Sequence, residues 1–510
     1  MRRARRRRRF HPVSLTLFVV VIGSGVRPAT GVAAEWQISP SLSVGEAYND
    51  NINLSTNGTK KLSDFITTVS PDLRVTGVGQ RLQLNFEYSP ELLLYMRGNG
   101  SNGVQQTLLG VGNLEAIQDT LFLNAKASVS EQFLNTAGSV STSTLTNSNN
   151  LQTVQTYQVG PDFRHHFGSY ANLDSSVTYT AVRSGGGVLS DSDAVESKAQ
   201  LSSGEYFGRL GWTLTGDDQE THRSSLSSAS SVNPNTTSAL GFGTTSTDRY
   251  ARSDFQYAVT DWISALAGGG YEKIKDPTVL TNLSGALWDV GAEYKPVERL
   301  DVKLTYGRRF NQPNWDGSVK YQFAADALLT VEYTETLQTS QSLFVNNLNF
   351  LAAGPNGTFI DTRTGQIFTA GNLPLAFANN TFIQKQFTAN VQMTRGRNTY
   401  SAQAYDEQQI FQIGDTIVRT QGGGFTWARQ LPRNFLLNVN LTYSHTNWGN
   451  AVNLEDGRID NLYGVSAGLT YKMTETLQSS LSVTRTQRVS NFSQEGLSND
   501  IVFLTVTKQF

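Results

Sequence analysis

Cysteine is absent from this chain of 510 residues, and its one long apolar run, Val13–Gly23, lies close to the start. Without cysteine no disulfide can hold the fold, so backbone pairing and side-chain packing must do so. A helix that crosses a membrane needs about 20 consecutive apolar residues. With 38% hydrophobic residues and a mean hydropathy of −0.31, the chain beyond residue 23 offers no such run, which excludes a helical membrane protein.

An excess of positive charge is also absent. The whole chain carries 41 basic and 42 acidic residues, and its first 34 residues hold eight arginines and no acid. The remainder therefore has 33 basic and 42 acidic residues, a net charge of −9. Proteins that bind nucleic acids present a basic surface to the phosphates. We therefore expect no nucleic-acid partner.

The N-terminus has the three parts of a secretory signal peptide. Seven arginines within residues 2–9 form a basic region, Val13–Gly23 forms an apolar region, and Val32-Ala33-Ala34 offers small residues before Glu35. This order is typical of a cleaved export signal. We predict a signal peptide over residues 1–34, cleavage between Ala34 and Glu35, and a single domain over residues 35–510. An uncleaved anchor is disfavoured because the apolar run is short.

Beyond the signal, apolar and polar residues alternate with a period of two. From Phe435 to Tyr443 every odd-numbered residue is apolar, whereas Asn438, Asn440 and Thr442 between them are polar. A tight turn over residues 431–434, with proline inside it, precedes this segment. Alternation flanked by turn residues predicts β-hairpins. The same pattern recurs at residues 82–88, 288–306 and 463–489.

Alternation occurs in soluble β-sandwiches and in membrane β-barrels, so other features must decide between them. The apolar faces repeatedly end in tyrosine, as an aromatic girdle at a membrane interface requires. Turns on one side are short, and loops on the other are long and polar. No linker divides the chain, which is too long for one sandwich. These features favour a barrel; the tyrosines are Tyr88, Tyr179, Tyr294, Tyr306, Tyr443 and Tyr471.

We therefore predict an all-β fold: a single antiparallel, up-and-down transmembrane β-barrel of about 22 strands, within a range of about 18 to 22. Short turns would face the periplasm, and long extracellular loops are expected at residues 135–150, 222–247 and 338–380. The pentapeptide TETLQ occurs at residues 334–338 and again at residues 474–478. We place a turn at the second copy and, for the first copy, at Ala325-Asp326. The reverse choice would lower the count toward 20.

The chain ends inside a strand pattern. Residues 501–510 read IVFLTVTKQF, and Val502, Leu504 and Val506 alternate with more polar positions. The segment resembles the C-terminal insertion signal of bacterial outer-membrane β-barrels, in which the barrel-assembly machinery reads a terminal phenylalanine. The resemblance implies that role for Phe510 and an outer-membrane location in a Gram-negative bacterium, with membrane lipid and lipopolysaccharide as surroundings.

Residues 38–54, ISPSLSVGEAYNDNINL, place a proline-led alternating strand before Tyr48-Asn49-Asp50-Asn51-Ile52. This opening, with residues 504–510, resembles the putative β-barrel porin 2 family and the related barrels encoded with exosortase (PEP-CTERM) and exopolysaccharide systems. The resemblance implies an outer-membrane barrel, with polysaccharide as a candidate cargo. The family carries no established catalytic residues, so none are transferred.

Residues with catalytic potential are few and show no diagnostic spacing. Beyond residue 34 the histidines are His165, His166, His222 and His445; we place the first two at a tight turn and the last on an outward face. Three Gly-Gly-Gly runs lack the lysine and following helix of a phosphate-binding loop. We attribute the runs to crowded strands; they lie at residues 185–187, 268–270 and 422–424. We expect no enzyme activity, no cofactor and no metal.

The opening of so wide a barrel needs an obstruction. Barrels of 16 to 18 strands already leave an aqueous channel, and the strand pattern begins at Trp36, which leaves no separate plug domain before it. We predict that residues 338–380 fold inward, with a small hairpin at residues 359–368. Asp361 and Arg363 would then set a field across a pore constriction. An exposed surface hairpin is an equal alternative.

These observations favour a passive or gated conduit for polar solutes or exported polysaccharide. Three alternatives remain: a structural or adhesive barrel with ligand-binding loops, a barrel hydrolase, and a secreted soluble β-protein. The sequence does not identify the solute or the oligomeric state.

Overall fold

The computed structural model describes residues 34–185, 189–224, 244–277, 279, 282–354, 358–362, 379, 381–412, 416–450 and 457–510. Residues 34–510 form one compact unit. No helix within these described residues is long and apolar enough to cross a membrane.

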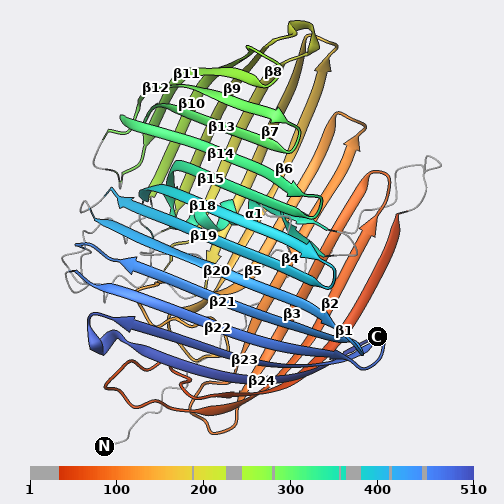
Figure 1. The fold of residues 1–510 in the computed structure, drawn as a ribbon, viewed down its shortest axis with the longest axis vertical. Coiled ribbons are helices and arrows are strands. Elements are labelled where there is room, and N and C mark those ends of the chain that lie inside the picture. Colours follow the sequence, from red (N-terminus) through yellow and green to blue (C-terminus); the bar gives the residue numbers. More distant parts are fainter. Residues whose placement is uncertain are drawn as a thin grey trace, which may run out of the picture. The chain divides into compact units, whose positions relative to one another are not determined.

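Twenty-two strands form one antiparallel sheet (Figure 1). The first half comprises β1 (Glu35–Asn49), β2 (Asp64–Val78), β3 (Leu82–Tyr95), β4 (Gly103–Ile117), β5 (Leu121–Phe133), β6 (Leu151–Phe167), β7 (Ala171–Ser184), β8 (Ser192–Ser203), β9 (Leu210–Arg223), β10 (Thr244–Ala258) and β11 (Ile263–Lys275). The second half comprises β12 (Gly285–Val297), β13 (Leu300–Arg309), β14 (Gln312–Ala324), β15 (Ala327–Thr339), β18 (Thr381–Arg395), β19 (Asn398–Phe411), β20 (Ile417–Leu431), β21 (Phe435–Asn447), β22 (Ile459–Lys472), β23 (Leu477–Ser490) and β24 (Leu497–Gln509).

The sheet closes on itself, because β1 pairs with β2 on one side and with β24 on the other. Every other barrel strand pairs with its neighbours in chain order, and β15 pairs with β18 across an insertion. Closure leaves no free sheet edge along the paired region, which a β-protein in lipid requires. The predicted barrel of 22 strands is confirmed, and so is the turn at Ala325-Asp326, because the first TETLQ copy ends β15.

Side chains alternate between the outside and the lumen, as the pleat dictates. In β24, Val502, Leu504 and Val506 face outward and are exposed, whereas Ile501 is buried inside. An outward row of exposed apolar residues is the arrangement that acyl chains stabilise. Outward aromatic pairs lie toward both ends of the strands, for example Phe435 stacked on Tyr471 at the short-turn end.

The turns and loops differ at the two ends of the barrel. Nine of the ten connections at the end that carries both chain termini have two to four residues, such as the turn between β20 and β21, where Arg433 and Asn434 adopt left-handed φ values of 60° and 64°. The opposite end carries the longer connections, with one exception. The connection between β13 and β14 consists only of Phe310 and Asn311, whose φ values are 54° and 58°. We call these the short-turn end and the long-loop end.

Two predicted loop boundaries are wrong. His222 and Arg223 belong to β9 and Thr244–Thr247 to β10, so that loop spans residues 224–243. Gln338 and Thr339 end β15, so the third loop begins at residue 340. Cross-strand pairing continues to both positions, which polarity alone does not reveal.

Candidate functional site: the occupied lumen

The connection between β5 and β6, residues 134–150, crosses the long-loop end of the lumen. Its backbone carbonyls accept hydrogen bonds from the barrel wall: Leu145 O from Asn49 Nδ2 at 2.7 Å and Thr146 O from the Tyr95 hydroxyl at 3.3 Å. Farther around the barrel, Thr142 Oγ1 lies 2.6 Å from Thr486 Oγ1 of β23. The segment therefore reaches wall strands on both sides of the β1–β24 seam. We call residues 134–150 the crossing loop.

Buried charges hold the crossing loop. Arg458 and Asp460 are 3% and 4% exposed and form an ion pair of 2.8 Å. Arg458 Nη2 also donates to Ala137 O at 3.0 Å, and Arg488 Nη1 donates to Gly138 O at 2.5 Å. A buried guanidinium needs its donors satisfied, and loop carbonyls supply part of that need. The crossing loop and the wall thus depend on each other.

A second segment enters the lumen between β15 and β18. It begins with the helix α1 (Ser340–Asn349), which starts where the Thr339 side chain accepts from the Ser342 backbone N–H at 3.1 Å and Ser342 Oγ bonds back to the Thr339 N–H at 2.8 Å. Such a reciprocal capping box stabilises a helix start. A two-stranded ribbon follows, β16 (Leu351–Ala353) paired with β17 (Phe359–Asp361). We call the described residues 340–354 and 358–362 the inner segment.

The inner segment contacts the wall opposite its own strands (Figure 1). Lys126 Nζ of β5 donates to Asn349 O at 2.7 Å, and Gln158 Nε2 of β6 donates to Asn349 Oδ1 at 2.9 Å. Asn85 Nδ2 of β3 donates to Thr358 O at 3.0 Å. Because Asn85 is the fourth residue of β3, counted from the short-turn end, the segment reaches deep into the lumen.

Apolar contacts support the same position. Leu348, Leu351 and Phe359 of the inner segment are 1%, 0% and 4% exposed and pack with Leu109 and Val111 on the inner face of β4. Apolar residues on the lumenal face of a barrel are unusual, since that face normally contacts water. Here the inner segment covers them.

Of the predicted hairpin at residues 359–368, only residues 359–362 lie within the described part of the chain. Phe359–Asp361 is the second strand of the ribbon and pairs with Leu351–Ala353. A partner was available upstream, because α1 turns the chain back toward the wall. Asp361 lies at the end of β17, and Arg363 lies outside the described residues. A constriction formed by Asp361 and Arg363 stays a prediction.

The inner wall is chemically uneven. On strands β8–β14 the lumenal positions carry a dense set of charges, linked by ion pairs such as Arg309–Glu272 at 2.6 Å and Arg252–Asp289 at 2.5 Å. We call these strands the charged wall. Its acids outnumber its bases: Glu196, Asp217, Asp248, Asp254, Glu272, Asp289, Glu293, Asp301 and Asp316 against Lys198, Arg223, Arg252, Lys295, Lys303, Arg309 and Lys320.

The wall formed by β20–β24 and β1 is nearly uncharged along its middle. Hydroxyl and amide side chains face one another there, for example Ser43 and Thr507 at 2.8 Å and Thr470 and Ser480 at 3.2 Å. Side chains of this kind donate and accept hydrogen bonds without charge. We call this uncharged inner face of β20–β24 and β1 the neutral track. The lumen therefore presents one charged and one neutral surface to a solute.

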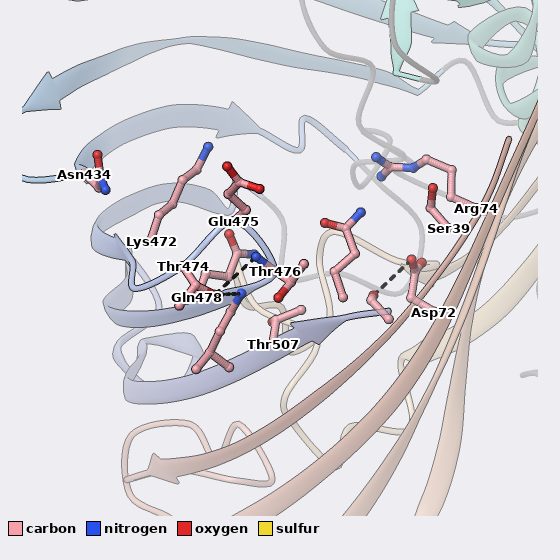
Figure 2. A pocket seen from close by; sticks show the side chains of 13 residues that line it. Ser39, Asp72, Arg74, Asn434, Lys472, Thr474, Glu475, Thr476, Gln478 and Thr507 are labelled. Carbon is pink, nitrogen blue, oxygen red and sulfur yellow. Dashed lines mark hydrogen bonds between the residues drawn. The ribbon is translucent and has the colours of Figure 1, made fainter.

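Toward the short-turn end, the neutral track opens into a cavity of about 540 Å³ (Figure 2). Arg74 and Asp72 of β2 line one side, and Lys472, Glu475 and Gln478 line the other (Figure 2). Arg74 pairs with Glu87 at 2.8 Å, and Ser41 donates to Asp72 at 3.3 Å. Both signs of charge thus border this mouth.

Glu35, Phe510, His165 and His166, which the sequence singled out, lie at the short-turn end. Glu35 begins β1, directly after Ala34, and Phe510 is 72% exposed, with its backbone N–H donating to Pro40 O at 2.9 Å. His165 and His166 are in β6 and not in the following turn, which begins at residue 168; His166 Nδ1 lies 2.7 Å from Asn172 Oδ1. Among the described residues, no group of three or more metal-ligating side chains occurs.

Outward ion pairs mark the long-loop end of the outer surface. Arg485 pairs with Asp500 at 3.0 Å, directly beyond the apolar row of Leu481 and Val483. Arg249–Asp218 at 2.8 Å and Arg419–Asp406 occupy equivalent outward positions. Charges here fit the polar headgroup layer above the hydrocarbon.

Sequence reasoning missed Arg458, Arg488 and Asp460. Counting by twos from the outward Val489 and Tyr463 places all three side chains in the lumen. Charged residues at lumenal positions directly beside a long loop were the signal that could have found them.

Comparison with known proteins supports the barrel fold of the whole chain and the predicted family for its C-terminal part. Residues 388–510 match the model of the family Putative beta-barrel porin 2. No curated protein is significantly similar in sequence. The structure is similar to the FrpB iron transporter from Neisseria meningitidis: for the F3-3 variant the TM-score is 0.50 at 12% identity, covering 94% of this chain and 82% of that chain.

The F5-1 variant of the same transporter, in its apoprotein form, gives a TM-score of 0.50 at 11% identity over 94% of this chain and 82% of that chain. At such identity the likeness concerns the fold, which is that of an outer-membrane β-barrel. The family match confirms the predicted family for the C-terminal strands, from Thr388 in β18 onward. Over residues 388–510, this chain is similar to the putative beta-barrel porin 2 family.

Proposed function

We propose that this protein is a gated conduit for polar solutes in the outer membrane, and that the structure describes its closed state. The observation that carries the proposal is the inner segment, whose ribbon packs against β4 deep in the lumen. A barrel of 22 strands encloses a lumen wide enough to need such an obstruction. The long polar loop that follows β15 supplies it.

The geometry favours the inner segment as the movable part. Lys126, Gln158 and Asn85 of the opposite wall bind backbone carbonyls or an amide of the inner segment, so these three contacts involve no charge on the segment's side. The crossing loop, in contrast, is held by buried guanidinium groups. Breaking buried ionic contacts costs more than releasing neutral ones.

The cargo is a polar solute, and exported polysaccharide is our preferred candidate. The neutral track of hydroxyl and amide side chains supports it, because such groups suit a chain rich in hydroxyls. The family resemblance to barrels of exopolysaccharide and PEP-CTERM systems points in the same direction. We propose no catalytic role: His166, His222 and His445 lie beside side chains of Asn172, Thr245 and Asn461.

We also propose the route to the membrane. The signal at residues 1–34 would be removed before Glu35, and Phe510, exposed at the short-turn end, would be available to the assembly machinery. The outward pairs Arg485–Asp500 and Arg249–Asp218 would contact lipopolysaccharide headgroups. Fractionation of cells that express the full chain tests the location, and N-terminal sequencing tests the cleavage.

Planar-bilayer conductance tests the gate. In the deletion variant, residues 340–380 are replaced by a short Gly-Ser linker, which is feasible because Thr339 and Thr381 are cross-strand neighbours. We expect small or rare openings for the full chain and a large, steady conductance for the variant. A matched control shortens the connection at residues 204–209, which joins β8 to β9 at the short-turn end. Equal conductance in all three proteins contradicts the proposal.

A further inference from the structure

A second cavity, of about 420 Å³, lies between the crossing loop and the inner face of β18–β22. Val140, Ser141 and Thr142 of the loop line one side, and strand residues around Tyr405 line the other. Ligand pockets in proteins typically measure about 300 to 1,000 Å³. The cavity is therefore of a size that holds a small ligand or a short segment of a longer one.

Tyr405 lies flat against the wall of this cavity. Its cross-strand neighbour is Gly422, and a Cβ atom at that glycine would stand 2.6 Å from Tyr405 Oη and 2.7 Å from Cζ. Only glycine leaves that space, so the ring rests on the strand and turns its other face toward the cavity. The adjacent pair repeats the arrangement: a Cβ at Gly424 would stand 3.3 Å from Gln403 Nε2. The Gly-Gly-Gly run at residues 422–424 thus leaves space for the side chains of Tyr405 and Gln403.

Three amide side chains line the same cavity as the ring. Gln386, Asn390 and Gln403 line the cavity, and none of them has a side-chain hydrogen bond to another residue in the described part of the chain. Each amide presents two N–H donors and one carbonyl acceptor. An aromatic face with unused amides beside it forms a surface with one apolar plane and a neutral polar border.

Charged residues also line the cavity, but they are engaged with the protein. Asp460 accepts from Trp448 Nε1 at 2.9 Å and pairs with Arg458, while Arg488 donates to crossing-loop carbonyls. Glu407 accepts from Gln409 Nε2 at 2.5 Å. The close contacts of Arg458, Asp460 and Arg488 offset their charges, whereas Glu407 is buried and bound to a neutral amide, so it disfavours an anionic ligand. The groups left for a ligand are the ring and the amides.

We propose that this cavity is a binding subsite for a neutral glycan, with a sugar ring stacked on Tyr405 and its hydroxyl groups bound by Gln386, Asn390 and Gln403. A pyranose has the matching chemistry, since one face carries C–H groups and the rim carries hydroxyls that donate and accept. The inference rests on the proposed conduit, in which the subsite would hold a passing polysaccharide next to the crossing loop.

Isothermal titration calorimetry on the full-length barrel tests the subsite, in a detergent without a sugar headgroup. The probes are hexasaccharides of α-1,4-glucose, β-1,4-glucose and β-1,4-N-acetylglucosamine, with hexagalacturonate as the acidic comparison. We expect at least one neutral probe to bind and Tyr405→Ala to weaken it about tenfold, the size of an aromatic stacking contribution. Tyr405→Phe should bind nearly as the parent does, because the ring and not the hydroxyl carries the contact.

Tyr463→Ala is the matched control, because this tyrosine faces outward and is 44% exposed. Gln403→Ala is a second test in case Tyr405→Ala does not fold, which heat-modifiable gel mobility reveals; it should weaken binding at least threefold. Binding of no neutral probe, preferred binding of hexagalacturonate, or unchanged binding by both cavity variants overturns the subsite. A protein that conducts but binds no glycan contradicts the subsite alone, whereas one that binds glycan and never conducts contradicts the conduit alone.

Discussion

Phe359→Ala tests how the inner segment is held in the lumen. Phe359 is 4% exposed and packs with Leu348 and Leu351 of its own segment and with Leu109 and Val111 of the wall. Truncating a buried phenylalanine to alanine costs roughly 3 to 5 kcal/mol. The barrel itself keeps its strand pairing, so most of this loss falls on the contact between segment and wall.

The magnitude translates into gating. Each 1.4 kcal/mol changes an equilibrium about tenfold, so a loss of about 3 kcal/mol raises the ratio of open to closed states by about a hundredfold. Single-channel recording at fixed voltage measures that ratio as open probability, with the conductance of each opening unchanged. The steep rise is expected only if the cluster around Phe359 is broken when the pore opens.

Leu304→Ala is the comparison variant, because Leu304 faces outward and is 52% exposed. It removes apolar volume from the barrel without touching the inner segment and should leave open probability within about twofold of the parent. If Phe359→Ala folds, inserts and opens no more often than the parent, the inner segment is not the gate.

Three further predictions concern the wall, the lumen and assembly. Arg458→Ala leaves Asp460 buried without its partner and should destabilise the folded barrel by roughly 3 to 5 kcal/mol, seen as a lower temperature for the loss of its compact gel mobility; an unchanged temperature contradicts the buried network. The excess of acids on the charged wall should make the opened deletion variant favour cations, and a reversal potential that favours chloride under a KCl gradient refutes this. Removal of Phe510 should lower the amount of assembled barrel severalfold in cell membranes without changing the amount synthesised, and equal assembly would exclude the proposed signal.

The barrel could be predicted from the sequence because its determinants are local. Alternation at Phe435–Tyr443 fixes a strand and its faces, and a turn with left-handed residues at Arg433 and Asn434 fixes the register of the hairpin. Strand order then follows chain order, since each strand pairs with the next. The two TETLQ copies are also placed correctly, since the turn at Ala325-Asp326 leaves the first copy at the end of β15.

The contents of the lumen could not be predicted in the same way. The helix α1, SQSLFVNNLN, has a weak apolar pattern, and its start depends on a cap between Thr339 and Ser342 inside a segment of low-complexity appearance. The partner of Phe359–Asp361 is a three-residue strand that is too short to show alternation. Contacts such as Arg488 with Gly138, 350 positions apart, arise only when the closed barrel brings both together.

A reducible cross-link between Gln158 and Asn349 is the most direct test that the inner segment closes the lumen. Their side chains meet at 2.9 Å, and the chain has no native cysteine, so Gln158→Cys with Asn349→Cys can be joined by a short disulfide-containing bis-maleimide and cleaved again. We predict that linked protein in a bilayer stays closed and that reduction restores openings. Channels that open equally well with the link intact would contradict the account.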